Sequence, residues 1–272
     1  MAESISPVSG PEKKPESPEL ALKTIRDAIP EHCFDRSLTH SFAYVVRDLI
    51  YASILFYGAL QIDLIPSQPL RILAWVAYGF AQGCVGTGIW ILAHECGHGS
   101  FSPYTTINDI VGWALHSLLL VPYFSWKITH ARHHRYTNNT ERDTAFVPYT
   151  DKTIAKRTRY LPAWIDVLED TPIYSFITLI AHQLAGWQMY LCFYVTAGVK
   201  SRPVQGKGTG WFGGQRSTSH FDPASSLWTE NQRHLIAISD FGLLLVGAAV
   251  WYLGQQVGGL RMFLMYFVPY LW

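Results

Sequence analysis

The chain has 272 residues, of which 49% are hydrophobic and 15% are charged, and its formal net charge is +1. A soluble domain usually carries about 25% charged residues, so this composition excludes both an ordinary soluble surface and a disordered chain. The small net charge argues against nucleic-acid binding, which needs a basic face. The four cysteines have no CxxC spacing and predict free thiols.

The first 21 residues are rich in proline, serine and glutamate. This composition predicts a disordered tail. The remaining residues, 22–272, form a second region with a different composition, in which long stretches carry no charge. We therefore expect a tail over 1–21 and one domain over 22–272.

Charge-free stretches predict membrane helices along this second region. Residues 72–93, 171–199 and 241–260 carry no formal charge, and 49–62 and 110–126 are shorter stretches of the same kind. About 20 apolar residues in a helix span the hydrocarbon core of a bilayer. The pattern predicts an all-α membrane protein whose transmembrane helices support a cytosolic helical cap rich in histidine.

The basic residues predict the orientation of these helices. Residues 1–48 carry six Lys or Arg and residues 125–170 carry eight, whereas 63–71 carry one. The positive-inside rule then places the N-terminus and the histidine-rich region in the cytosol. Residues 198–234 carry five Lys or Arg, so we expect this segment in the cytosol as well. We therefore predict that 171–197 is re-entrant or interfacial and that 110–126 is interfacial. Residues 235–257 and the run from 260 onward are then expected to form a membrane hairpin.

Two histidine motifs follow the stretch 72–93. The sequence reads HECGH at 94–98 and HARHH at 130–134. On a helix, residues three and four apart share one face, so each motif presents its imidazoles together. Neutral imidazole suits iron, zinc, copper and nickel. The two motifs predict a metal site whose ligands are His94, His98, His130, His133 and His134.

A zinc peptidase is the alternative reading of the first motif. HECGH also fits the pattern HExxH, in which two histidines bind zinc and the glutamate is a general base. Such a site needs only one further protein ligand, which leaves the three histidines of the second motif without a role. Gly97 and Gly99 are also poor residues for a rigid helix. A membrane zinc peptidase therefore stays the less favoured reading.

The short sequence stretches around both motifs resemble those of membrane acyl-lipid desaturases. The chain has HECGHGSFS at 94–102, HARHHRYTNN at 130–139, FVP at 146–148 and AIPEHCF at 28–34. The pattern is most similar to the delta-12 (oleate) desaturases of fungi and plants, and it extends from about residue 22 to the end. Omega-3 desaturases, acetylenases and fatty acid hydroxylases are close relatives and remain alternatives.

The resemblance implies an activity, cofactors and partners. It implies an endoplasmic-reticulum enzyme that introduces a cis double bond at the delta-12 position of oleoyl chains in a membrane lipid, giving linoleate. It also implies a di-iron centre held by histidines, O2 as co-substrate, and cytochrome b5 with its reductase as electron donor. Regioselectivity and the choice between phospholipid-bound and CoA-bound acyl substrates stay open.

Several other residues carry expectations. Glu95 and Asp143 are candidates to orient imidazole N–H groups, although solvated or helix-end carboxylates are equally compatible with their positions. His116 lies in an apolar run and is expected to be a core or interfacial residue. The glycines of the stretch 72–93 favour close helix packing over room for an acyl chain; they are Gly79, Gly83, Gly86 and Gly88.

The resemblance also implies a third histidine box toward the C-terminus, which this chain lacks. No histidine follows His234. Five imidazoles would leave two irons under-coordinated, and the final apolar run is shorter than a span. We therefore expect the domain over 22–272 to be incomplete and the chain alone to be inactive. The alternative is a complete but degenerate protein whose last segment stays interfacial.

Overall fold

The computed structural model describes residues 18–148, 168, 171–203 and 217–272, and these residues form helices without any strand. This confirms the predicted all-α class. Residues 18–37 belong to a first unit that contains α1 (Pro18–Asp27) and the 3-10 helix η1 (Glu31–Phe34). Because α1 begins at Pro18, the last four residues of the predicted tail 1–21 are helical; residues 1–17 lie outside the described residues.

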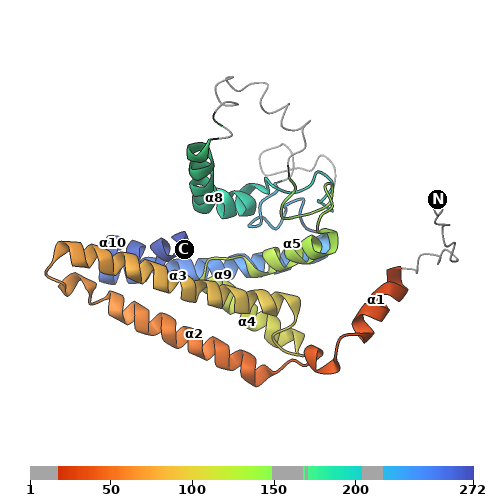
Figure 1. The fold of residues 1–272 in the computed structure, drawn as a ribbon, viewed down its shortest axis with the longest axis horizontal. Coiled ribbons are helices and arrows are strands. Elements are labelled where there is room, and N and C mark those ends of the chain that lie inside the picture. Colours follow the sequence, from red (N-terminus) through yellow and green to blue (C-terminus); the bar gives the residue numbers. More distant parts are fainter. Residues whose placement is uncertain (1–17, 149–167, 169–170, 204–216) are drawn as a thin grey trace, which may run out of the picture. The chain divides into compact units, whose positions relative to one another are not determined.

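The second unit begins with a helical hairpin. Helix α2 (Leu38–Ala59) leads through η2 (Ile62–Leu64) into α3 (Gln68–His98), and the two long helices lie side by side (Figure 1). Gly88 of α3 lies against the buried Asp48 of α2, where a Cβ would come within 3.1 Å of a carboxylate oxygen. The missing side chain of Gly88 thus leaves room for the Asp48 carboxylate between the two helices, in keeping with the predicted use of these glycines for packing.

Helix α3 is longer than a membrane span requires. Its 31 residues extend about 46 Å at 1.5 Å per residue, against a hydrocarbon core of about 30 Å. Gly99, with φ 74°, ends the helix in the left-handed conformation that glycine adopts without strain. The last turn, which carries the first histidine motif, therefore lies beyond the apolar stretch 72–93.

A sharp bend separates the next two helices. Helices α4 (Thr105–Leu118) and α5 (Tyr123–Tyr136) meet at 109° across a break of four residues. Within that break Leu120 has φ 51° and Pro122 directly precedes α5. The apolar stretch 110–126 therefore contains this bend and does not form one straight helix.

The C-terminal half adds α8 (Pro172–Phe193) and, after η3 (Glu230–Gln232), α9 (Arg233–Val257). At Gly258, with φ 94°, the chain turns into three short helices: α10 (Gly259–Met262), the π-helix η4 (Phe263–Phe267) and η5 (Val268–Leu271). This final segment packs along α3, where the hydroxyl of Tyr78 donates to the carbonyl of Met265 over 2.8 Å.

The glycines of α3 show what this packing needs. A Cβ on Gly83 would lie 2.6 Å from the carbonyl oxygen of Pro269, and one on Gly79 would lie 3.2 Å from Val268. Gly86 has nothing within 4 Å of that position. Three of the four predicted glycines therefore serve close helix packing, and Gly86 does not.

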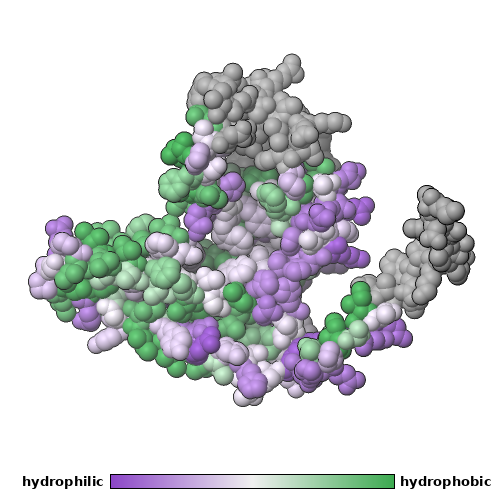
Figure 2. All heavy atoms as spheres, in the orientation of Figure 1, coloured by the Kyte–Doolittle hydropathy of each residue, from purple (hydrophilic) through white to green (hydrophobic). Residues whose placement is uncertain are grey.

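Three helical segments among the described residues are long and apolar enough to cross a membrane: Leu38–Leu64, Gln68–His98 and Glu230–Val257. The bent pair α4–α5 would make a fourth if it counts as one broken span, whereas α8 does not qualify. Figure 2 shows hydrophobic residues gathered over α2 and α3 and hydrophilic ones around the far end of α5. The re-entrant path of 171–197 and the predicted sidedness stay predictions.

Two turns distant in sequence meet at one end of this unit. Arg261 of α10 pairs with Asp63 of η2, with 2.8 Å between the Nε and Oδ2 atoms. Asp63 lies between α2 and α3, and Arg261 follows the turn at Gly258. The histidine motif lies at the opposite end of α3, so both turns are far from it.

Candidate metal centre

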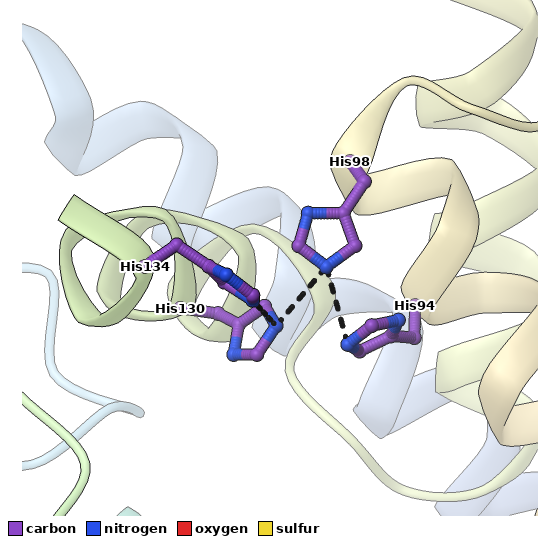
Figure 3. A group of neighbouring side chains, drawn as sticks. All are labelled: His94, His98, His130 and His134. Carbon is purple, nitrogen blue, oxygen red and sulfur yellow. Dashed lines mark hydrogen bonds between the residues drawn. The ribbon is translucent and has the colours of Figure 1, made fainter. Parts of the chain in front are cut away.

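Four histidines from two helices face one another. His94 and His98 lie one turn apart at the end of α3, and His130 and His134 lie one turn apart on α5 (Figure 3). The Nε2 atom of His98 is 3.2 Å from that of His94 and 3.2 Å from that of His130. The Nε2 atoms of His130 and His134 are 3.0 Å apart. The cluster therefore unites both predicted motifs.

The fifth predicted ligand is placed differently. One ligand atom from each of the four clustered histidines lies within 4.8 Å of the others, and His133 is outside this group. The ring centroid of His133 is 5.9 Å from that of His130 and 5.6 Å from that of His134. His133 thus borders the cluster, with its Nδ1 turned toward a carboxylate.

That carboxylate is Asp143, whose Oδ1 is 2.7 Å from Nδ1 of His133. Because a carboxylate only accepts, Nδ1 carries the proton and Nε2 keeps its lone pair for a metal. Burial alone would raise the pKa of Asp143, but hydrogen bonds from the Ala145 amide and from His133 hold this pKa below its ordinary value. The ionised acceptor is thereby favoured.

Glu95 has the same relation to His94. Its Oε1 is 3.0 Å from Nδ1 of His94, so Nε2 of His94 points its lone pair into the cluster. Ser100 donates to the other carboxylate oxygen. Both predicted orienting carboxylates therefore contact a motif histidine. A zinc-peptidase role for Glu95 is disfavoured, because this carboxylate is engaged by His94 and Ser100.

Aromatic residues that the sequence analysis did not single out support the cluster. The indole of Trp126 stacks on His130, with 4.3 Å between centroids and 20° between planes, and its centroid is 5.1 Å from that of His94. Trp90 lies 5.4 Å from His94. Trp90 and Trp126 each stand four residues before a motif histidine, and this helical spacing was the available signal.

The histidines outside the motifs have varied surroundings. His116 is fully buried between Trp90 and Trp126, with Nε2 3.3 Å from the Trp90 carbonyl oxygen, so it is the core residue that the sequence predicted. His182 is exposed on α8. His220, to which the sequence analysis gave no role, is fully buried beside Thr129 of α5.

The donor set fits a transition metal. Carboxylate contacts leave the Nε2 lone pairs of His94 and His133 available, and imidazole nitrogen is a good ligand for iron or zinc. The clustered ligand atoms also lie near enough together to share an ion. The four clustered histidines, with His133 beside them, would hold the metal.

Comparison with known proteins defines the class of protein. The model of the fatty acid desaturase family matches residues 70–272, which include all the histidines of the cluster. The chain therefore belongs to the fatty acid desaturase family.

Individual relatives are similar over nearly the whole chain. An oleate hydroxylase of Claviceps purpurea is 44% identical over 263 residues, covering 94% of this chain and 55% of the relative. A Delta(12) fatty acid desaturase of Mortierella alpina is 39% identical (96% and 64% covered), and a Delta(12)-fatty-acid desaturase of Vernicia fordii is 41% identical (93% and 61% covered). The chain thus spans 55–64% of the length of these relatives.

Proposed function

We propose that this chain carries the metal centre of a delta-12 acyl-lipid desaturase, which converts oleoyl chains of a membrane lipid into linoleoyl chains. The observation that carries the proposal is the convergence of four imidazoles from α3 and α5 in a member of this family. The relatives from Mortierella alpina and Vernicia fordii are named delta-12 desaturases, which supports the regioselectivity.

The proposed cofactor is a pair of iron ions with O2 as co-substrate. A methylene C–H bond is too strong for an acid or base of this chain, so bound iron would supply the oxidising chemistry. The histidines would hold the metal through their ring nitrogens, with Nε2 of His94 and His133 left free by the carboxylate contacts. Glu95 and Asp143 keep the protons of His94 and His133 on Nδ1, which fixes the orientation of both rings.

We further propose an endoplasmic-reticulum location, with the N-terminus and the histidines in the cytosol. The basic residues of 1–48 and 125–170 support this orientation. We also propose that electrons come from cytochrome b5 with its reductase, as the resemblance to acyl-lipid desaturases implies.

Oleate hydroxylation is the second candidate. The observation that favours it is the relative from Claviceps purpurea, named an oleate hydroxylase and 44% identical. A hydroxylase of this family would need the same metal site, so the cluster alone does not separate the two reactions. The product does, because a diene and a hydroxylated chain differ in mass and in chromatographic retention.

A segment exchange tests the function directly. Residues 70–272 replace the matching part of the Mortierella alpina desaturase, and the chimera is produced in yeast that makes oleate but no linoleate. We expect linoleate in total lipids and bound iron in the purified chimera. Hydroxylated oleate would instead establish the second candidate. A chimera that binds iron and leaves oleate unchanged would show the proposed reaction to be wrong.

Two single substitutions in the chimera test the site. His98→Ala removes the central imidazole of the cluster, and we expect it to abolish both product and bound iron while membrane insertion persists. His182→Ala, on the exposed surface of α8, is the matched control and should retain both. Product formation by the His98→Ala chimera would contradict the ligand assignment.

A further inference from the structure

His220 joins three segments that are far apart in the sequence. Its backbone N–H donates to the carbonyl of Leu191 at the end of α8 over 2.8 Å, and its Nδ1 is 3.2 Å from the same oxygen. Its Nε2 is 3.2 Å from the hydroxyl of Thr129 on α5. The ring has no solvent exposure.

The protons of this contact can be assigned from the donors and acceptors present. The carbonyl of Leu191 only accepts, so Nδ1 of His220 carries the proton. Nε2 of the neutral ring is then an acceptor, and the hydroxyl of Thr129 is the donor that faces it. The same hydroxyl also lies 3.2 Å from the carbonyl oxygen of Ser125 and 3.1 Å from that of Trp126, so its single proton is shared among three acceptors. Burial lowers the pKa of His220 to about 4, in keeping with a neutral ring.

Thr129 is the centre of a network of buried hydrogen bonds behind the metal centre. Its hydroxyl also receives a hydrogen bond from Tyr190 over 3.3 Å, and its carbonyl accepts from the hydroxyl of Thr144 over 2.7 Å. Thr129 directly precedes His130 in the chain, and Thr144 directly follows Asp143. These hydrogen bonds therefore involve the chain neighbours of two site residues, the clustered His130 and Asp143, whose carboxylate orients His133.

Nearby contacts attach the same side of α5 to the loop that carries His220. Three residues after Thr129, the guanidinium of Arg132 donates to the carbonyl of Leu227 over 2.6 Å and to Gln232 over 3.2 Å. Thr129 and Arg132 are three residues apart and so share one face of α5. His130 and His134 lie on another face, which is turned toward the cluster. Polar contacts of Thr129 and Arg132 thus hold this side of α5 to the segment that carries His220.

We propose that His220 is a positioning residue for the metal centre: by holding Thr129, it sets the rotation of α5 and so the direction of the imidazole of His130. This inference rests on the proposed metal site. It gives a role to a histidine that belongs to neither motif and contacts no clustered histidine.

Two substitutions of His220 separate its two hydrogen bonds. His220→Gln places an amide oxygen near the position of Nε2, so it can still accept from Thr129. His220→Asn places an amide N–H near the position of Nδ1, so it keeps the bond to Leu191 and loses the one to Thr129. Both variants lose the ring, which makes each the packing control of the other.

The readout is Co2+ binding by the whole chain in detergent, followed by the visible absorption of the bound ion. Loss of an outer contact of a metal site typically weakens metal affinity 10- to 100-fold. We expect His220→Asn to weaken Co2+ binding about tenfold, which is the low end of that range. We also expect this variant to shift the absorption bands of the bound ion. His220→Gln should bind within about twofold of the unchanged chain.

Thr129 supplies an independent pair of variants. Thr129→Val removes only the hydroxyl at similar volume and should match His220→Asn, whereas Thr129→Ser should match the unchanged chain. The double variant Thr129→Val with His220→Asn should bind no more weakly than either alone, because both remove one shared interaction. His182→Asn, exposed on α8, should change nothing.

The outcomes that would overturn the proposal are distinct. If His220→Asn and Thr129→Val lower thermal stability but bind Co2+ with unchanged affinity and spectrum, His220 is a packing residue only. If His220→Gln and His220→Asn weaken binding equally, the hydrogen bond to Thr129 is not the cause. If His98→Ala leaves Co2+ binding intact, the metal site and the proposed function are themselves wrong.

Discussion

At the scale of single residues, the chemistry of the site depends on where protons lie. Glu95 and Asp143 are acceptors, and each fixes the proton of its histidine on Nδ1. His220 is likewise held in one neutral form, by a carbonyl at Nδ1 and a hydroxyl at Nε2. Polar neighbours thus decide which nitrogen of each of these histidines remains an acceptor.

The buried His220 predicts a pH dependence of stability. Its pKa in the folded chain is about 4, because burial disfavours the charged ring, against about 6.5 when unfolded. Between these values the unfolded chain binds more protons, so stability falls as pH falls. The contribution is about 1.4 kcal/mol for each pH unit within this window.

Thermal unfolding of the metal-free chain in detergent, from pH 7 to 5, measures this effect. The chain should lose stability as the pH falls, and His220→Gln should show a shallower decline although it is less stable at pH 7. The exposed-site variant His182→Gln should keep the original slope. Equal slopes for His220→Gln and the unchanged chain would contradict a neutral, buried His220.

At the scale of elements, the bend between α4 and α5 brings the second motif to the first. Tyr123, the first residue of α5, packs directly on the backbone of Gly112 in α4. Its hydroxyl donates to Asp109 over 3.1 Å, and Lys127 pairs with the same carboxylate oxygen over 2.5 Å. The contact at Gly112 therefore helps to set where α5 begins.

A methyl group at Gly112 should disrupt this junction. The Cβ of Gly112→Ala would lie 2.3 Å from Cε2 of the fully buried Tyr123, so the ring must move. Overpacking of this kind costs about 1–3 kcal/mol. Gly247→Ala is the control, because nothing lies within 4 Å of its Cβ and alanine favours a helix by about 1 kcal/mol.

Both variants are compared by thermal unfolding in the same detergent. We expect a lower midpoint for Gly112→Ala and an unchanged or higher one for Gly247→Ala. A Gly112→Ala chain as stable as the original would mean that Tyr123 relaxes without cost, and that the close approach of α4 and α5 is dispensable.

At the scale of the whole second unit, the two turns joined by Asp63 and Arg261 lie at the end of α3 opposite the histidines. If α3 spans the membrane, these turns and the metal centre are on opposite sides. The exposed Leu64 of η2 and the exposed Val199 after α8 are suitable positions to report the two sides.

Cysteine labelling in sealed microsomes tests this arrangement. In a cysteine-free background, Val199→Cys should react with a membrane-impermeant maleimide added outside, because that side corresponds to the cytosol. Leu64→Cys should react only after the membrane is permeabilised. Labelling of Val199→Cys only after permeabilisation would place the loop after α8 in the lumen and make α8 a span.

The amino-acid sequence by itself determined the helical membrane class and the presence of two histidine motifs, and it predicted that these motifs bind metal. These features depend on local patterns: charge-free stretches of span length, and imidazoles three and four residues apart on one helix. The sequence also offered Glu95 and Asp143 as candidates to orient imidazoles without deciding for this role, because Glu95 adjoins His94 and Asp143 lies only ten residues beyond His133.

Only the tertiary structure decided which of the five motif imidazoles lie together in the cluster and which one lies beside it. His133 fits the motif as well as His130 and His134 do, yet it borders the cluster, with its Nδ1 turned to Asp143. The role inferred for His220 depends on Thr129, 91 residues away, and no local spacing encodes that contact. Pairings of this kind follow from how helices bend, rotate and pack, which is a property of the whole fold.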